Sequence, residues 1–495
     1  MKADDIKVEC QDLAYSKTSL LDDEIFETTH RKLKELYAKH GISKVLGELS
    51  KIWGFEKAVP FFDKMAAKTK IKIKGSVKTI ATFYHRAYNG GVEIVQAQLI
   101  TMWLEAGYKV VLITEDPPND LDYFYPKDKV KRIIIHSCLQ MSERLYDLQK
   151  ALEEENVDVF INHDWTTPSI LWESVLLHNL NIFYIIYAHG YFAVFYAIDY
   201  ALYYQIFKMA DLLIAISETN ARFYQMCGCR TCLIQNPVPE ALKNINQLAT
   251  LDSHHILWVG RIATEKRPLD AIQIFKKVHD FIPDAVLDIV GGAELDWLER
   301  MKNFSKELGV FDAVKFHGLQ SWEKMRDFYE NSAVLLFTSE GEGYPMTLLE
   351  SKAFGLPCVM YSLPYLSLFK DGKGFLSAEI GDINKMANNI IGLLTNDKQK
   401  KSLGSAARES FDAFVNYDLL ENWKKIFNFC EGKEVVNEIF YMPDKLEERD
   451  KYIIPPLLDV VRDTAIKRSE SKSLDYKIGH KILKIPRKIV EIFKR

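Results

Sequence analysis

AVLLFTSEGEGYPMTLLESKAFGLP, residues 333–357, is the stretch from which the rest of the chain can be interpreted. Its first seven residues form a short, mostly apolar run, which predicts a buried strand. Pro345 suits the first turn of a helix, because the N–H that it lacks would have no helical partner there. Gly355 and Pro357 are typical of a helix end. Residues 341–343 are therefore predicted to form a tight turn between a strand and a helix.

A turn of this kind suits a bound phosphate. The backbone N–H groups at a helix N-terminus have no helical acceptor, and the helix dipole is positive at that end. Glu342 lies in the turn and Glu350 lies inside the helix, with seven residues between them. Carboxylates so placed can bind different parts of one extended ligand. The pair alone is equally consistent with a solvent-exposed helix face.

Length and composition limit the class of protein. A chain of 495 residues is too long for one ordinary core and predicts two domains with extensions. An apolar content of 48% and a charged content of 27% are typical of a soluble globular protein. The net charge of −4 gives no reason to expect nucleic acid as a partner. The acidic start is not a secretory signal, and His189 with Gly190 interrupts the longest apolar run, so no membrane span is predicted.

The cysteines and acidic residues predict no metal site. Seven scattered cysteines indicate a reducing compartment, hence a cytoplasmic protein. Cys227, Cys229 and Cys232 lie close together, but a fourth ligand at the spacing of a zinc finger is missing. The triplet DLD at 120–122 matches a D-x-D metal-binding pattern formally. It lies in a proline-rich loop, and we interpret it as a turn.

Two α/β series follow one another along the chain. The predicted domains are a helical extension over 1–74, a first Rossmann-like domain over 75–250, a second over 251–412, a late helix over 413–430 that packs back on the first domain, and an extension over 431–495. Residues 1–74 carry no chemistry and are expected to form a cap or a surface for a protein partner. Strands are predicted at 77–84, 108–114, 130–136, 157–163, 182–190, 211–217, 231–236, 255–260, 285–292, 313–318, 333–339 and 356–362.

Paired glycines follow the first of these strands. Gly90 and Gly91 open the next helix and permit close approach of the backbone to an anion. The segment does not match G-x-G-x-x-G, so a dinucleotide site is not supported. A glycine pair of this kind is, by itself, more often structural.

Two cations follow the first strand of the second series. Arg261 comes directly after Gly260 at the strand end, and Lys266 lies five residues later. A planar guanidinium and a compact ammonium group can bind the same anionic ligand. Solvated loop cations are the usual interpretation of such residues, but the glycine before Arg261 and the helix start at Pro268 favour a binding role.

Taken in order, these motifs resemble the retaining GT-B glycosyltransferases of family 4. The matching segments, between about residues 77 and 428, are NGGVE, the His-Gly of YAHG, IQNPV, VGRIATEKRP, DIVGG, VKFHG and EGEGYPMTLLESKAFGLP. The resemblance implies an α/β protein with two Rossmann-like domains facing a central cleft. It implies a metal-independent transfer of a sugar from a nucleotide-diphosphate sugar, without other cofactors, in bacterial cell-surface glycan assembly.

The resemblance also implies a role for individual residues. Arg261 and Lys266 hold the donor diphosphate, and Glu350 binds the ribose. Glu342 lies at the donor sugar, and His189 lies at the sugar hydroxyls or the reacting face. The implied catalytic residues are His189, Glu342, Arg261 and Lys266, and the implied donor-binding residues are Gly90, Gly91, Gly260, Arg261, Lys266, Gly291, His317, Gly343, Tyr344, Pro345 and Glu350.

Other functions stay open at this point. The acceptor could be a glycan, a lipid-linked glycan or a protein. A non-catalytic subunit that binds another transferase would explain residues 1–74, although the retained charged residues argue against it. A GT-B epimerase or phosphorylase is a further alternative, but a phosphorylase needs a cofactor-bearing lysine or a phosphate site that the sequence does not show. Neither the nucleotide nor the sugar follows from short motifs.

Residues 467–495 are expected to bind anionic membrane surfaces at the inner face of the cell membrane. They contain ten Lys or Arg against three Asp or Glu, with isoleucines at spacings of three and four on one helical face. Pro486 should divide the helix into two short segments lying flat. The alternative is a helix docked on the protein itself.

We predict that the full chain sediments with anionic vesicles and that a chain ending at Ile466 does not. Each basic residue near an anionic leaflet contributes about 1 kcal/mol, so several give reversible binding. Equal sedimentation of both chains would assign the binding to another part of the protein.

Overall fold

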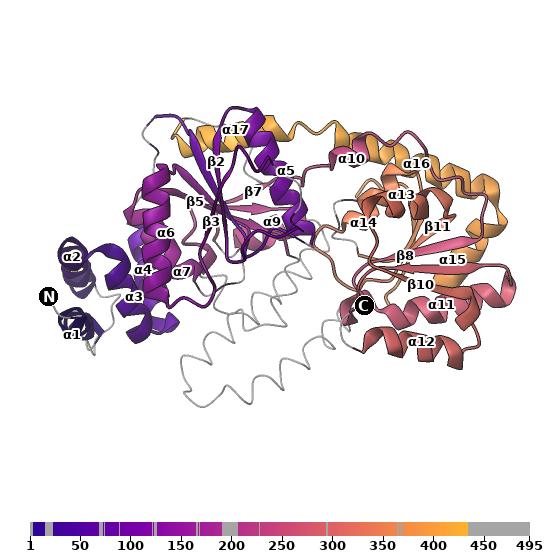
Figure 1. Ribbon diagram of the computed structural model, residues 1–495, viewed down its shortest axis with the longest axis horizontal. Coiled ribbons are helices and arrows are strands. Elements are labelled where there is room, and N and C mark those ends of the chain that lie inside the picture. Colours follow the sequence, from indigo (N-terminus) through magenta and orange to yellow (C-terminus); the bar gives the residue numbers. More distant parts are fainter. Residues whose placement is uncertain are drawn as a thin grey trace. The chain divides into compact units, whose positions relative to one another are not determined.

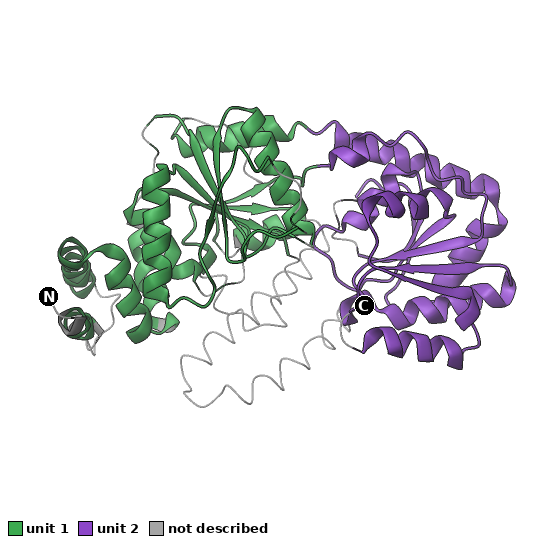
Figure 2. Ribbon diagram, in the orientation of Figure 1, with its two compact units in different colours: residues 1–237, 418–495 green, residues 238–417 purple. Residues whose placement is uncertain are grey.

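The computed structural model describes residues 3–14, 23–68, 73, 75–88, 90–120, 122, 126–164, 167, 169–190, 206–226, 228–293, 296–363, 366, 368 and 370–433. Two compact units divide the chain, as Figure 2 shows. The first takes in the chain up to Pro237 and the helix that follows Asp418, and the second is Val238–Tyr417. Each unit is a parallel sheet with helices packed against it, so the predicted α/β fold class is confirmed.

Seven parallel strands form the sheet of the first unit, in the order β3-β2-β1-β4-β5-β6-β7 (Figure 1). Their bounds are β1 Thr79–Phe83, β2 Lys109–Thr114, β3 Lys131–Ile134, β4 Val159–Asn162, β5 Phe183–Ala188, β6 Leu212–Ala215 and β7 Thr231–Leu233. β1, β4, β5 and β6 are buried along their whole length, as continuous apolar runs are in parallel sheets with helices on both faces. The strand order reverses between β1 and β4, where open α/β sheets bind ligands.

The helices of the first unit begin with four that precede the sheet. The helices of the whole unit are α1 Ala3–Ala14, α2 Asp23–His40, α3 Ile42–Ile52, α4 Phe55–Lys68, α5 Gly91–Glu105, α6 Met141–Glu155, α7 Ile170–Asn179, α9 Glu218–Met226 and α17 Leu419–Cys430. Gly41 has a φ of 89° directly after α2, which is the helix end expected from the sequence.

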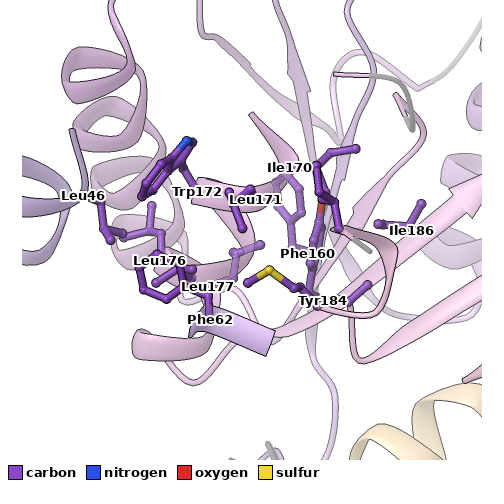
Figure 3. Close-up of a cluster of buried hydrophobic side chains, with 14 of the residues drawn as sticks. Leu46, Phe62, Phe160, Ile170, Leu171, Trp172, Leu176, Leu177, Tyr184 and Ile186 are labelled. Carbon is purple, nitrogen blue, oxygen red and sulfur yellow. The ribbon is translucent and has the colours of Figure 1, made fainter. Parts of the chain in front are cut away.

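The amino-terminal helices share the hydrophobic core of the first sheet. Figure 3 shows Leu46 of α3 and Phe62 of α4 among side chains of α7 and of strands β4 and β5. The rings of Phe62 and Trp172 lie 5.8 Å apart at an angle of 77°, an edge-to-face contact. Residues 23–68 are therefore part of the first unit's packing.

The second unit has six parallel strands in the order β10-β9-β8-β11-β12-β13. The strands are β8 His255–Val259, β9 Val286–Val290, β10 Val314–Gly318, β11 Val334–Phe337, β12 Cys358–Tyr361 and β13 Phe375–Ala378. The helices are α10 Glu240–Lys243, α11 Pro268–Phe281, α12 Trp297–Glu307, α13 Trp322–Asn331, α14 Met346–Ala353, α15 Ile383–Thr395 and α16 Asp397–Val415, with short 3₁₀ turns at Thr264–Lys266 and Phe311–Ala313.

Two features of this unit differ from the sequence-based expectation. β13 was not predicted, because it is an edge strand whose residues are only partly buried and follow one another without a long apolar run. The boundary between the units lies after Pro237 and not near residue 250. Val238, Leu242 and Ile245 are buried in the hydrophobic core of the second unit, which assigns the intervening residues to it.

Helix α14 ends as the sequence predicts. The N–H of Gly355 donates to the carbonyl of Lys352, and the N–H of Leu356 donates to the carbonyl of Ser351. With a φ of 64° at Gly355, this is a Schellman motif, which satisfies carbonyls that a helix end leaves open. Pro345 lies one residue before the helix, at the N-cap position.

Helix α17 returns the chain to the first unit after α16. The Trp423 ring meets the Trp103 ring of α5 edge to face, with centroids 4.9 Å apart, and Phe427 packs on Tyr108 at 5.0 Å. The N–H of Ile73 donates to the carbonyl of Cys430. The first unit is thus completed by residues far from it in sequence.

No helix in the described part of the chain is long and apolar enough to cross a bilayer. The basic tail proposed to bind membranes lies outside the described residues.

We predict that Trp423→Ala destabilises the first unit by about 3–5 kcal/mol, the cost of truncating a buried aromatic ring. Amide hydrogen exchange measured strand by strand should show faster exchange in β1–β7 and unchanged exchange in β8–β13. Lys424→Ala, at a side chain with 48% exposure on the same helix, is the control. Equal effects of the two substitutions would contradict this packing role.

Candidate functional site

In the second unit, two loops that follow neighbouring strands are joined by hydrogen bonds. β8 and β11 pair in parallel, so both loops leave the same edge of the sheet. The N–H of Glu340 donates to the carbonyl of Glu265 at 3.0 Å. Thr338 donates its hydroxyl to the Lys266 carbonyl at 2.7 Å and accepts a bond from the indole of Trp258 at 2.9 Å. The predicted cation loop and the predicted glutamate loop therefore form one surface.

The side chains of these loops meet through an ion pair. The ammonium group of Lys266 contacts a carboxylate oxygen of Glu342, with side-chain exposures of 21% and 11%. Arg261 is more open, with a side chain 61% exposed and a bond to Glu265 at 2.5 Å. An exposed pair of this kind adds little stability, so Arg261 can exchange its partner at small cost. The structure brings Arg261, Lys266 and Glu342 to the same pair of loops.

Arg267, which the sequence analysis did not select, links the two loops through ion pairs. Its guanidinium donates to Asp270 at 2.7 Å and to Glu340 at 3.0 Å. Its φ of 47° is unusual for a residue other than glycine, and this left-handed conformation comes just before α11. The bonds to two carboxylates hold this conformation in place.

Gly260 and Gly291 let the ends of adjacent strands approach closely. A Cβ atom on Gly291 would lie 1.9 Å from the carbonyl oxygen of Gly260, and the φ of 145° at Gly291 disfavours other residues. The N–H of Gly260 donates to the Val290 carbonyl at 3.0 Å, and that of Gly291 donates to the Gly318 carbonyl at 2.9 Å. Both glycines therefore shape the backbone from which Arg261 leaves β8.

Glu350 lies inside α14, eight residues after Glu342. Its carboxylate accepts a hydrogen bond from the hydroxyl of Tyr329, and burial raises its pKa above the ordinary 4.5. Gly343, Tyr344 and Pro345 lead into the helix, and the Tyr344 hydroxyl is buried without a partner among the described residues. The two glutamates of the motif thus have different partners, a lysine for Glu342 and a tyrosine hydroxyl for Glu350.

His317 has a partner within its own sheet. Its imidazole bonds to one oxygen of Asp288 at 2.7 Å, and His255 bonds to the other oxygen at 2.6 Å. The His317 ring also packs against Phe328, with centroids 4.6 Å apart. The structure therefore ties His317 to β9 and to α13.

In the first unit, Gly90 and Gly91 open helix α5 as predicted, at its N-terminus. The carboxylate of Glu93 lies against Gly90, where an added Cβ atom would be 2.3 Å from it. Glu93 is buried and bonded to Arg86 at 2.6 Å. The positive end of this helix is therefore close to an internal carboxylate and its arginine.

His189 forms a buried pair with His163 at the ends of β5 and β4. Nδ1 of His163 lies 2.8 Å from Nε2 of His189, and the rings are stacked with centroids 5.1 Å apart. Tyr187 stacks on His189 at 4.3 Å and donates its hydroxyl to Asn236 at 2.9 Å. Burial lowers the pKa of His189 to about 3 and that of His163 well below its ordinary value. Both rings are neutral at physiological pH.

The acidic triplet at 120–122 has a structural partner. The side chain of Asp122 is fully buried and forms an ion pair with Arg132 at 2.5 Å. Cys229 and Cys232 are buried thiols, and Cys227 lies outside the described residues. Within the described ranges, no group of three or more His, Cys, Asp or Glu side chains is arranged to hold a metal ion.

Several contributors to these sites have no motif of their own. His163, Arg267 and Tyr329 act through contacts with His189, Glu340 and Glu350. His163 and Tyr329 lie 26 and 21 residues from their partners in sequence, and Arg267 lies 73 from Glu340. Only the strand-end position of His163 offered a signal before the fold was known.

Comparison with known proteins assigns both units to one enzyme class. Residues 89–242 match the family described as Glycosyltransferase Family 4, and residues 243–410 match Glycosyl transferases group 1. An uncharacterised glycosyltransferase of Haemophilus influenzae is 25% identical over 354 residues, which are 68% of this chain and 96% of that protein. The lipopolysaccharide 1,6-galactosyltransferase of Salmonella typhimurium is 26% identical over 231 residues, 45% of this chain and 61% of that enzyme.

Comparison with solved structures agrees with these family matches. Sucrose-phosphate synthase from Thermosynechococcus elongatus superposes with a TM-score of 0.61 at 18% identity, covering 71% of this chain and 98% of that one. At this identity the likeness shows the fold alone, and it agrees with the two family matches. The chain belongs to the group 1, family 4 glycosyltransferases, which have the GT-B fold.

Proposed function

We propose that the protein transfers a sugar, with retention at the anomeric carbon, from a nucleotide-diphosphate sugar to an acceptor in bacterial cell-surface glycan assembly. The observation that carries the proposal is the joined pair of loops that brings Arg261, Lys266 and Glu342 together at the ends of β8 and β11. The relationship to a lipopolysaccharide galactosyltransferase supports a glycan acceptor.

The proposed chemistry follows from the charges of the reaction. Breaking the bond between sugar and diphosphate leaves negative charge on phosphate oxygens. Arg261 and Lys266 stabilise that charge, and the N-terminus of α14 adds its dipole. Glu342, at the donor sugar, is not assigned as a nucleophile. The acceptor attacks on the face of the leaving group, and a phosphate oxygen takes the acceptor proton.

Donor binding and product analysis test this function. A panel of nucleotide sugars is screened by thermal shift, since a ligand that binds the folded protein raises its apparent stability. The donor so found is incubated with glycan and lipid-linked acceptors, and the anomeric coupling of the product is measured by NMR. Retention is expected. Inversion would reject the mechanism, and binding without transfer would favour a non-catalytic subunit.

Arg261→Ala and Lys266→Ala should each lower kcat/KM by the equivalent of about 2–4 kcal/mol, the scale for one charge-assisted donor in a transition state. Lys276→Ala is the control, because Lys276 is a partly exposed cation of α11 paired with Asp280. Near-normal kcat/KM in both site variants would remove the diphosphate assignment.

Transfer is expected to continue in EDTA. In the proposed site two cations and a helix N-terminus supply the positive charge that a divalent ion supplies elsewhere. Activity is measured before and after chelation, and again with added Mn²⁺ or Mg²⁺. Loss of activity that either ion restores would show that the transfer requires a metal.

Glu350→Gln separates the stability of the fold from donor binding. Because burial raises the Glu350 pKa, the folded state favours the protonated acid, and wild-type stability falls as pH rises through that pKa. The variant should therefore be more stable than wild type at pH 8 and equal to it at pH 4, while the loss of the charged ribose ligand weakens donor binding. Urea unfolding at both pH values measures the difference. Equal stability at pH 8 would show that Glu350 is not held in a costly buried state.

A further inference from the structure

The buried histidine pair of the first unit has a consequence for the proton of His189. Nδ1 of His163 and Nε2 of His189 are 2.8 Å apart, which is a hydrogen-bond distance. A neutral imidazole carries one proton, on one of its two nitrogens. For a hydrogen bond to form, one of the two contacting nitrogens, Nδ1 of His163 or Nε2 of His189, must carry a proton and the other must not. The tautomers of the two rings are therefore linked, and changing one changes the other.

Two arrangements satisfy this count. In the first, Nδ1 of His163 donates to Nε2 of His189, and the remaining proton of His189 is on Nδ1. In the second, Nε2 of His189 donates, and His163 must carry its own proton on Nε2. That atom is buried without a partner among the described residues. The second arrangement leaves an N–H group buried and unbonded, whereas the first leaves a lone pair. Buried unbonded N–H groups are the rarer of the two in folded proteins.

Neighbouring groups hold the two imidazole rings of His163 and His189 in position. His163 has no exposed surface, and its backbone N–H donates to the carbonyl of Phe83 in β1 at 2.9 Å. His189 retains 9% exposure, so it is the member of the pair that can meet a ligand. Tyr187 covers one face of His189 and is itself anchored on Asn236. Protonation of either ring would put a charge in this enclosed stack, which burial opposes.

We propose that His163 is a positioning residue that fixes His189 in the neutral form with its proton on Nδ1, so that His189 offers a ligand a hydrogen-bond donor. This rests on the proposed function and on the place that the family resemblance implies for His189, at the hydroxyls of the donor sugar or the reacting face. A fixed N–H donor suits an oxygen of a sugar hydroxyl, and it does not suit the removal of a proton. His189 thus orients the substrate and is not a general base.

The tautomer can be measured without any substrate. In protein labelled with ¹⁵N-histidine, the chemical shifts of the His189 nitrogens distinguish Nδ1–H from Nε2–H, and a His189→Gln sample assigns the signals. Wild type is expected to show protonated Nδ1 at neutral pH, with no titration near pH 6. A protonated Nε2 in wild type would overturn the proposal, whether or not a donor is ever found.

Two variants test the link between the rings. His163→Phe keeps an aromatic ring and removes the donor, so His189 should lose its single tautomer, and kcat should fall by about 10- to 100-fold, the range for losing an outer hydrogen bond that orients a histidine. His163→Asn places an amide N–H near the position of Nδ1 and should restore both the ¹⁵N pattern and most of the activity. Tyr146→Phe is the control, because Tyr146 is an exposed aromatic residue of α6 in the same unit, and both readouts should stay as in wild type.

The outcomes separate this proposal from the proposed function. An unchanged His189 spectrum and unchanged kcat in His163→Phe would refute the positioning role while leaving the transferase function standing. If His163→Phe does not fold, the wild-type spectrum and the His163→Asn variant still decide. Absence of transfer in wild type, with the predicted tautomer observed, would count against the function and not against the pairing.

Discussion

The contact between Lys266 and Glu342 is the interaction on which the second unit's site depends. It closes two loops that leave neighbouring parallel strands, and the backbone bond from Glu340 to Glu265 supports it. The Lys266 side chain is only partly exposed, so an anion beside it offsets part of the cost of removing its charge from water. A bound diphosphate would supply such an anion in greater charge than one carboxylate. The free protein therefore already contains, in Glu342, a weaker substitute for the group that we propose Lys266 binds.

Backbone geometry makes this contact possible. Parallel strands bring their carboxyl ends to one edge, but loops converge there only if the strand ends can approach closely. Gly260 and Gly291 permit that approach, since a side chain on Gly291 would collide with the carbonyl of Gly260. Arg267 has a left-handed backbone conformation, and its ion pairs with Asp270 and Glu340 offset the cost of that conformation. The close approach at Gly260 and Gly291 and the ion pairs of Arg267 thus both shape the loops of this site.

The fold was largely predictable because buried parallel strands are continuous apolar runs, and those runs end within one to three residues of the predicted bounds. β13 was not predicted because an edge strand is only partly buried. The unit boundary was misplaced because the burial of Val238 and Leu242 depends on tertiary contacts. In the site, Arg261 and Lys266 share one motif and were found from it. His163 and Tyr329 were not selected, since their partners are distant in sequence and no local pattern records a hydrogen bond across a sheet.

The two glutamates of the motif show how one sequence pattern can contain two kinds of chemistry. Glu342 forms an ion pair with Lys266. Glu350, in α14, accepts a hydrogen bond from the Tyr329 hydroxyl, and desolvation raises its pKa. A carboxylate can accept about four hydrogen bonds, so one hydroxyl leaves most of that capacity unused. A pair of neighbouring ligand hydroxyls would fill it and remove part of the cost of burying the charge. Binding would then recover part of the stability that the raised pKa of Glu350 costs the folded protein, which supports the proposed contact between Glu350 and the ribose of the donor.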